Sequence, residues 1–179
     1  LHPMKDWLAD SPSDKNWYDY VVQMNKDKPF SYKENKEHIL AQEAIEKVSK
    51  MSDRNTIAVT DVGQHQMWAA QFFKVYDPRH FITSGGLGTM GYGLPAAMGI
   101  KLGCPDKKVV LFSGDGSIMM NCQELATLAD YNIDVKIIVI HNHVLGMVTQ
   151  WQRMFYGKRY SQSILNSKAD IVKIAQAMG

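Results

Sequence analysis

Two side chains with hard oxygen atoms lie at the ends of neighbouring apolar segments and could together bind a cation. Asp115 belongs to a Gly-Asp-Gly-Ser sequence just after the apolar stretch 108–112, and Asn142 ends the next apolar stretch, 27 positions after Asp115. In a chain of strand, helix and strand, this interval returns the backbone to the same edge of a parallel sheet, so we expect the two side chains to face each other. A carboxylate and a side-chain carbonyl are typical ligands of Mg²⁺, which keeps further positions for water and phosphate oxygens. The pair therefore predicts a metal-bound diphosphate.

Each of these side chains also has a simpler structural explanation. Asp115 could cap the helix that follows it, and Asn142 could serve only as a turn residue after a strand. The capping and binding roles of Asp115 are compatible, because the backbone amides of Gly116 and Ser117 at the start of a helix would bind phosphate oxygens. The pairing of the carboxylate with Asn142 at this interval favours the cation.

The elements that must position these residues alternate between strand and helix. Apolar and β-branched runs predict strands at 56–60, 80–83, 108–112 and 135–140. Helical periodicity and capping residues predict helices at 33–51, 67–74, from near 95, 119–130, from about 146 and at 170–178. This alternation predicts an α/β three-layer sandwich, a mostly parallel sheet with helices on both faces.

Composition narrows the class of protein further. A chain of 179 residues with 45% hydrophobic and 21% charged residues is typical of one domain with a substantial core. Its formal charge of +2 and scattered Lys and Arg do not favour nucleic acid or an anionic membrane as a partner. We expect Cys104 and Cys122 to be reduced, inert thiols in or near buried segments, in a cytoplasm-like compartment. Residues 1–10 lack the apolar core of a signal peptide, so neither secretion nor membrane spanning is expected.

Several segments together resemble the catalytic subunit of acetolactate synthase. The Gly-Asp-Gly-Ser sequence with its distant Asn is similar to the metal and diphosphate motif of thiamine diphosphate enzymes in general. Three further segments, GQHQMW, GGLGTMGYG and GMVTQW, make the likeness more specific, and they lie within 60–68, 83–95 and 145–151. The resemblance runs from about Ser31 to Gly179. One departure is visible, because the family usually has two adjacent Asn residues where this chain has His141 and Asn142.

The resemblance implies the cofactor-binding domain of a carboligase, a transferase that depends on thiamine diphosphate and Mg²⁺. Such an enzyme decarboxylates pyruvate and joins the two-carbon unit to a second 2-oxo acid. The products would be 2-acetolactate or 2-aceto-2-hydroxybutyrate, in branched-chain amino acid biosynthesis. The full-length enzyme would also carry FAD, form a homodimer or tetramer, and associate with a regulatory small subunit. Its compartment would be the cytoplasm, or an organelle in a eukaryote.

The resemblance also implies roles for individual residues. The metal ligands would be Asp115, Asn142 and the backbone carbonyl of Val144. Gln64, His65 and Ser117 would add hydrogen bonds to the diphosphate, while Met90 would hold the cofactor ring. The whole cofactor-binding set is Val62, Gly63, Gln64, His65, Gly88, Met90, Asp115, Gly116, Ser117, Asn142, Val144, Gly146 and Met147. The substrate pocket would be lined by Met147, Val148 and Trp151, with Trp151 shaping the choice of the second 2-oxo acid.

We expect the sequence to be a fragment that is truncated at both ends. Residues 1–30 begin without Met and mix Trp and Tyr with Pro, Asp, Ser and Lys, which is typical of a linker from an upstream domain. Residues 31–179 would be the thiamine diphosphate and Mg²⁺ domain, truncated at its C-terminus because no strand follows the helix at 170–178. The family's activating glutamate lies in a separate N-terminal domain supplied by a partner subunit. We therefore expect no catalytic residue here and an inactive isolated chain.

Other interpretations remain open. The segment 86–91 formally matches the dinucleotide fingerprint G-x-G-x-x-G, with Asp106 about 20 residues further on. Gly93 and Pro95 push the helix start beyond those glycines, which disfavours NAD. His141 and His143 could bind zinc, although no third ligand of matching spacing is evident. The chain could also belong to another thiamine diphosphate-dependent decarboxylase or carboligase, or be a catalytically silent binding module.

Overall fold

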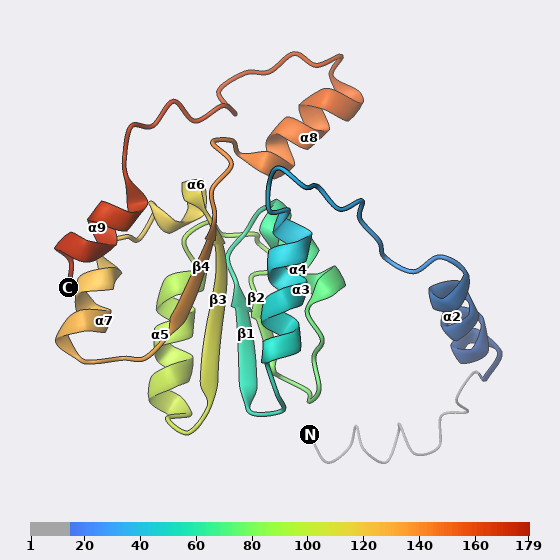
Figure 1. Ribbon diagram of the computed structural model, residues 1–179, viewed down its shortest axis with the longest axis horizontal. Helices are drawn as coiled ribbons and strands as arrows, with labels where there is room; N and C mark the ends of the chain where they lie inside the picture. Colours follow the sequence, from blue (N-terminus) through green and yellow to red (C-terminus); the bar gives the residue numbers. More distant parts are fainter. Residues whose placement is uncertain (1–14) are drawn as a thin grey trace. The chain divides into compact units, whose positions relative to one another are not determined.

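A single parallel sheet of four strands organises the computed structural model, which describes residues 15–179 (Figure 1). Its strands, in the spatial order β2-β1-β3-β4, are β1 (Thr56–Thr60), β2 (Phe81–Thr83), β3 (Lys108–Gly114) and β4 (Lys136–Ile140). Each neighbouring pair is parallel, so each connection must cross from one end of the sheet to the other. The carboxyl ends of the strands consequently meet at one edge.

Helices make these connections and flank the sheet. The helices of the described residues are α2 (Lys15–Asp27), α3 (Ala41–Met51), α4 (Gln64–Phe72), α5 (Gly93–Gly103), α6 (Asp115–Ile118), α7 (Glu124–Asp130), α8 (Gly146–Phe155) and α9 (Ile171–Ala177). The chain divides into two compact units between Lys33 and Glu34. The first unit contains α2, and the second contains the sheet and all the other helices described.

The core lies on both faces of the sheet because alternate residues of β3 point to opposite sides. Val109 and Leu111 belong to a cluster with residues of α5, and it comprises Val59, Leu94, Ala97, Met98, Val109, Leu111 and Ile118. Val110 and Phe112 belong to the other cluster, which joins α3 and the α4 region and comprises Ile45, Ala58, Ala69, Phe73, Val110 and Phe112. The predicted α/β sandwich with helices on both faces is therefore confirmed.

Two of the predicted helices are longer than the helices that the structure contains. The helix expected at 33–51 begins only at Ala41, because its apolar stripe starts at Leu40 and residues 33–39 are exposed and, apart from Ile39, polar. The helix expected at 119–130 begins only at Glu124, as α7, because residues 119–123 form a turn after α6. In that turn the Asn121 side-chain amide donates a hydrogen bond of 2.8 Å to the Gly91 carbonyl, a tertiary contact that periodicity does not reveal.

The N-terminal unit contains a helix that the sequence did not suggest. Residues Lys15–Asp27 of the expected linker form α2, on which the rings of Trp17 and Tyr20 stack with centroids 5.6 Å apart. Residues 1–14 of that expected linker lie outside the described residues, and they include residues 1–10, where no signal-peptide core is expected. The domain boundary proposed at residues 30 and 31 stays a prediction.

Two smaller observations complete the fold. Cys104 and Cys122 are free thiols, but Cys104 is exposed rather than buried as expected, because it follows the end of α5 at the surface. Within residues 15–179, no helix combines the length and the apolar character that a membrane crossing requires.

Candidate functional site

A cavity of about 240 Å³ opens at the carboxyl edge of the sheet. Its walls come from four segments that lie far apart in the sequence, namely 62–68, 88–90, 114–117 and 140–148. In Figure 1, α6 and α8 follow β3 and β4 at this edge. Every residue of the predicted cofactor-binding set lines this cavity, and Trp68, Gly114, Ile140, Leu145 and Val148 line it as well. The structure thus gathers the predicted set in one place, while the role of each member stays a prediction.

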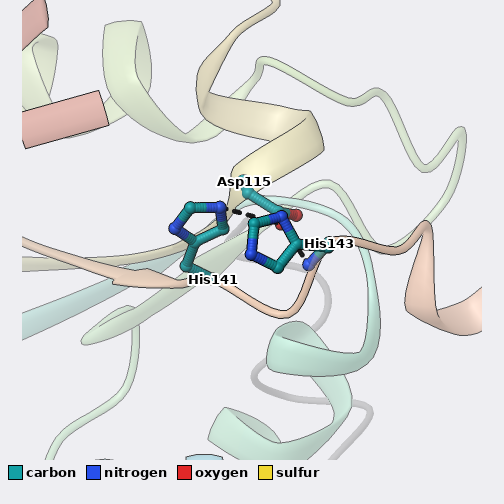
Figure 2. Close-up of side chains that lie close together, drawn as sticks. All are labelled: Asp115, His141 and His143. Carbon is teal, nitrogen blue, oxygen red and sulfur yellow. Dashed lines mark hydrogen bonds and ion pairs between the residues drawn. The ribbon is translucent and has the colours of Figure 1, made fainter. Parts of the chain in front are cut away.

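Asp115 is the buried carboxylate of this cavity. Its side chain is only 7% exposed and lies at the start of α6. One carboxylate oxygen, Oδ1, accepts a hydrogen bond of 2.8 Å from the Gly116 amide, and the other, Oδ2, accepts one of 2.7 Å from the His143 amide. The Nε2 atom of His141 lies 3.8 Å from the same Oδ2 (Figure 2). Asp115 therefore ties the turn after β3 to the loop after β4.

Asn142 shares the cavity with Asp115 but makes a different contact from the one expected. Its side-chain oxygen accepts a hydrogen bond of 3.2 Å from the Val144 amide, which is the local turn that the sequence left open as an alternative. The contact between this loop and Asp115 is made by the backbone of His143 instead. The ligand set of Asp115, Asn142 and Val144 stays a prediction.

His65 is a buried, uncharged wall of the cavity. Burial lowers its pKa from 6.5 to about 4, although the nearby carboxylates of Asp61 and Asp115 oppose the shift. Its Nε2 atom is buried and has no hydrogen-bond partner among the described residues. Gly63 and Gly114 lie against the ring, since a Cβ at either position would come within 2.8 or 2.9 Å of it. Glycines at these two positions therefore leave room for the imidazole.

The hydrogen bonds of Gln64 and Ser117 hold the cavity walls together. The Gln64 amide nitrogen donates to the Gln150 side-chain oxygen at 2.7 Å, which joins α4 to α8. The Ser117 hydroxyl donates to the Val62 carbonyl at 2.8 Å, which joins α6 to the loop after β1. The hydroxyl proton of Ser117 is thus committed within the protein, so the predicted contribution of Ser117 to a phosphate rests on its backbone amide.

Asp61 is a site-forming residue that the sequence reasoning missed. It is fully buried, and its Oδ1 accepts hydrogen bonds from the amides of Val62 (2.9 Å) and Gly91 (2.8 Å). Its Oδ2 accepts longer ones, both 3.3 Å, from the Gly93 amide and the Ser113 hydroxyl. Asp61 thereby holds the glycine-rich segment beside the cavity. Its place directly after β1, at the edge where Asp115 follows β3, is the signal that could have revealed it.

The glycine-rich segment does not have the geometry of a dinucleotide fingerprint. In that fingerprint the helix opens at the glycines. Here the segment turns through Gly88 and Gly91, whose φ angles are 64° and 89°, and α5 begins only at Gly93. The glycines therefore serve a loop that is hydrogen-bonded to Asp61.

A second hollow, of about 470 Å³, adjoins the cavity along α8. Met147 and Val148 line both spaces, whereas Trp151 lines only the second, together with Gln152, Tyr156 and Arg159. The Trp151 side chain is exposed and meets the Phe155 ring edge-on with centroids 6.2 Å apart. The three residues of the predicted substrate pocket thus follow one face of α8 away from the cavity.

Comparison with known proteins identifies the family. The model for the C-terminal TPP binding domain of thiamine pyrophosphate enzymes matches residues 61–179. The acetolactate synthase large subunit of Lactococcus lactis is 46% identical over 168 residues, which are 93% of this chain and 29% of that protein. The probable acetolactate synthase large subunit of Methanococcus aeolicus is 54% identical over 127 residues, 71% of this chain and 21% of that protein. The isozyme 3 large subunit of Escherichia coli is 43% identical over 165 residues, 92% of this chain and 29% of that protein.

These matches agree with the geometry of the site. The chain spans less than a third of the length of these curated relatives. The matched region contains β2 to β4 and α4 to α9, and it begins at Asp61, directly before the first cavity segment. By sequence and by fold, the chain belongs to the thiamine pyrophosphate enzymes, with residues 61–179 matching their C-terminal TPP-binding domain.

Proposed function

We propose that this chain is the cofactor-binding part of a thiamine diphosphate-dependent carboligase of the acetolactate synthase type. The observation that carries the proposal is the convergence of the whole predicted cofactor-binding set on one cavity at the carboxyl edge of the sheet. The relatives at 43 to 54% identity bear the acetolactate synthase name. The proposed reaction decarboxylates pyruvate and transfers the two-carbon unit to a second 2-oxo acid, which gives 2-acetolactate or 2-aceto-2-hydroxybutyrate.

The residues of the cavity fit a metal-bound diphosphate. Asp115 offers a buried carboxylate, and the oxygens of Asn142 and Val144 belong to the same wall, which is the hard oxygen set that Mg²⁺ prefers. The buried Nε2 atom of His65 lacks a protein partner among the described residues, as expected for a group that meets a ligand. Glycines at positions 63, 114 and 116 leave room for the cavity's side chains, since a Cβ at any of them would come within 2.9 Å of His65 or Leu145.

The chain's own residues would bind and orient the cofactor. Thiamine diphosphate, when bound, supplies the nucleophilic carbon that makes decarboxylation of 2-oxo acids possible. Asp115 would anchor the metal, and the amides of Gly116 and Ser117 would donate to phosphate oxygens. Met90 would support the cofactor ring as an apolar contact. Trp151, which lines the adjoining hollow, would form a large rigid wall for the acceptor 2-oxo acid.

The rest of the enzyme is part of the same proposal. We expect the full-length protein to carry FAD, to form a homodimer or tetramer, and to obtain the activating glutamate from a partner subunit. A regulatory small subunit and a location in the cytoplasm, or in an organelle, are further expectations. Product analysis of the full-length enzyme separates this proposal from another thiamine-dependent decarboxylase, which would not form 2-acetolactate, and from a silent module, which would form nothing.

Calorimetric titration of thiamine diphosphate into the chain tests the cofactor site directly. We expect binding in the presence of Mg²⁺, loss of binding with a chelator, and loss of binding in Asp115→Ala. Asp106→Ala is the matched control, because it removes an exposed carboxylate outside the cavity and should leave binding unchanged. Circular dichroism establishes that each variant is folded. If binding is unaffected by the chelator and by the loss of Asp115, the proposed metal site is wrong. If the folded chain binds no thiamine diphosphate, the chain does not form a cofactor site without the rest of the enzyme.

A further inference from the structure

Two histidines approach the Asp115 carboxylate from the loop after β4. One nitrogen each from His141 and His143 and one oxygen of Asp115 all lie within 4.8 Å of one another, and Figure 2 shows the three side chains close together. The two imidazole rings have centroids 4.2 Å apart. The third ligand that the sequence could not supply for this pair is therefore Asp115, which precedes His141 by 26 positions but follows the neighbouring strand.

Local backbone geometry brings this cluster together. His143 has a φ angle of 59°, in the left-handed region that non-glycine residues adopt rarely. In this conformation its amide donates the 2.7 Å hydrogen bond to Asp115 Oδ2, so the loop that carries both histidines is tied to the carboxylate. Asp115 is buried and held by two amides, whereas both histidine side chains are exposed. An ion from solvent could therefore bind the fixed carboxylate of Asp115, and the two exposed histidine side chains could rotate towards the ion.

The chemistry of this cluster suits a transition metal better than Mg²⁺. Two imidazoles and one carboxylate form a three-ligand set that zinc uses with a water in the fourth position. Metal to ligand distances of about 2.0–2.2 Å place the ligand atoms about 3.3 Å apart, so rotation of the exposed rings would close the site. Mg²⁺ prefers oxygen ligands and has little affinity for imidazole, whereas Zn²⁺, Co²⁺ and Ni²⁺ bind it well.

We propose that Asp115, His141 and His143 form a binding site for a transition-metal ion such as Zn²⁺, and that this ion and Mg²⁺-bound diphosphate exclude each other. Exclusion follows because both sites require the carboxylate of Asp115. The zinc site stands on these three side chains alone, and only the exclusion rests on the proposed function. His141 and His143 supply the two nitrogen ligands, so these residues would give the site its preference for a transition metal over Mg²⁺.

Titration of Zn²⁺ alone into the chain, followed by calorimetry, tests the site. We expect one Zn²⁺ ion to bind per chain. His141→Asn and His143→Gln should each weaken Zn²⁺ binding by about tenfold or more, because even the loss of an outer-shell partner costs about 10- to 100-fold in affinity. Co²⁺ should give the visible absorption bands of a tetrahedral site in the wild type and not in His141→Asn.

Matched variants separate this site from the other ligands of the chain. His38→Gln removes an exposed histidine outside the cluster and should leave Zn²⁺ affinity unchanged. His141→Asn removes one imidazole but leaves the oxygens of Asp115, Asn142 and Val144 in place, so it should keep Mg²⁺-dependent thiamine diphosphate binding while it loses Zn²⁺. Unchanged Zn²⁺ affinity in the double variant His141→Asn/His143→Gln would overturn the site. Simultaneous binding of Zn²⁺ and Mg²⁺-bound thiamine diphosphate would overturn the exclusion.

The two proposals fail in different ways. If Zn²⁺ binding depends on His141 and His143 but no variant binds thiamine diphosphate, the metal site stands and the proposed cofactor site is wrong. If the binding of thiamine diphosphate requires Mg²⁺ and Asp115, while Zn²⁺ binding is unchanged by the loss of both histidines, the cofactor site stands and the zinc site is wrong.

Discussion

His65 shows how a single buried group can link the cavity to pH. Its imidazole is held neutral because burial removes the water that would stabilise the charged form, and the two nearby carboxylates compensate only in part. In the unfolded chain the same group would titrate near its ordinary pKa of 6.5. Between that value and about 4, the unfolded state therefore binds more protons than the folded state.

We expect folding stability to fall as the pH decreases through this window. Relative to His65→Gln, the wild type should lose about 2 kcal/mol of unfolding free energy between about pH 7 and about pH 5, since the folded pKa is the lower of the two. Urea denaturation at a series of pH values measures this difference. His38→Gln, an exposed histidine, should follow the wild-type curve. Parallel curves for the wild type and His65→Gln would show that His65 does not carry the effect.

The site also depends on how closely α5 packs on the sheet. Its first residue, Gly93, is buried, and a Cβ there would lie 2.7 Å from a Leu111 methyl and 3.0 Å from the backbone nitrogen of Asp61. Because one of these neighbours is backbone, it cannot rotate away. Gly99 lies in the same helix, but a Cβ there would meet nothing within 4 Å. The two positions form a natural pair for a test.

Alanine at these two glycines should have opposite effects on stability. Gly93→Ala should lower the unfolding free energy by about 1–3 kcal/mol, because overpacking forces β1 and α5 apart. Gly99→Ala should leave stability unchanged or raise it by up to about 1 kcal/mol, because alanine has the higher helix propensity. Chemical denaturation of both variants measures the contrast. Equal effects would mean that the approach of α5 to the sheet is looser than the structure shows.

The chain as a whole covers only part of what its relatives contain, since it spans less than a third of their length. We expect the isolated chain to convert no pyruvate to 2-acetolactate above background, even where it binds thiamine diphosphate, because the activating glutamate is expected in another domain. Colorimetric assay of acetolactate measures this, with the full-length protein as the positive control. Clear turnover by the isolated chain would refute the assignment of that glutamate to a missing domain.

Local sequence features predicted much of the architecture and of the site. The apolar runs that became β1 to β4 were placed to within two residues at each end, because strands buried on both faces leave a strong local signal. The Gly-Asp-Gly-Ser sequence and Asn142 were assigned to one edge of the sheet, and both line the same cavity. That inference needed only the rule that successive parallel strands end at the same edge.

Tertiary structure alone decided which groups touch. Chain spacing assigned Asp115 to this edge, but the loop path after β4 determined that the His143 amide and the two imidazoles, rather than the Asn142 side chain, approach the carboxylate. Likewise, only packing showed that Asp61 binds the amides of Gly91 and Gly93, about 30 residues away in the chain. Periodicity and spacing determine which elements form and which ends meet, because those depend on local backbone geometry. The pairing of individual donors and acceptors depends on loop conformations, and these are set by contacts between residues that are distant in the sequence.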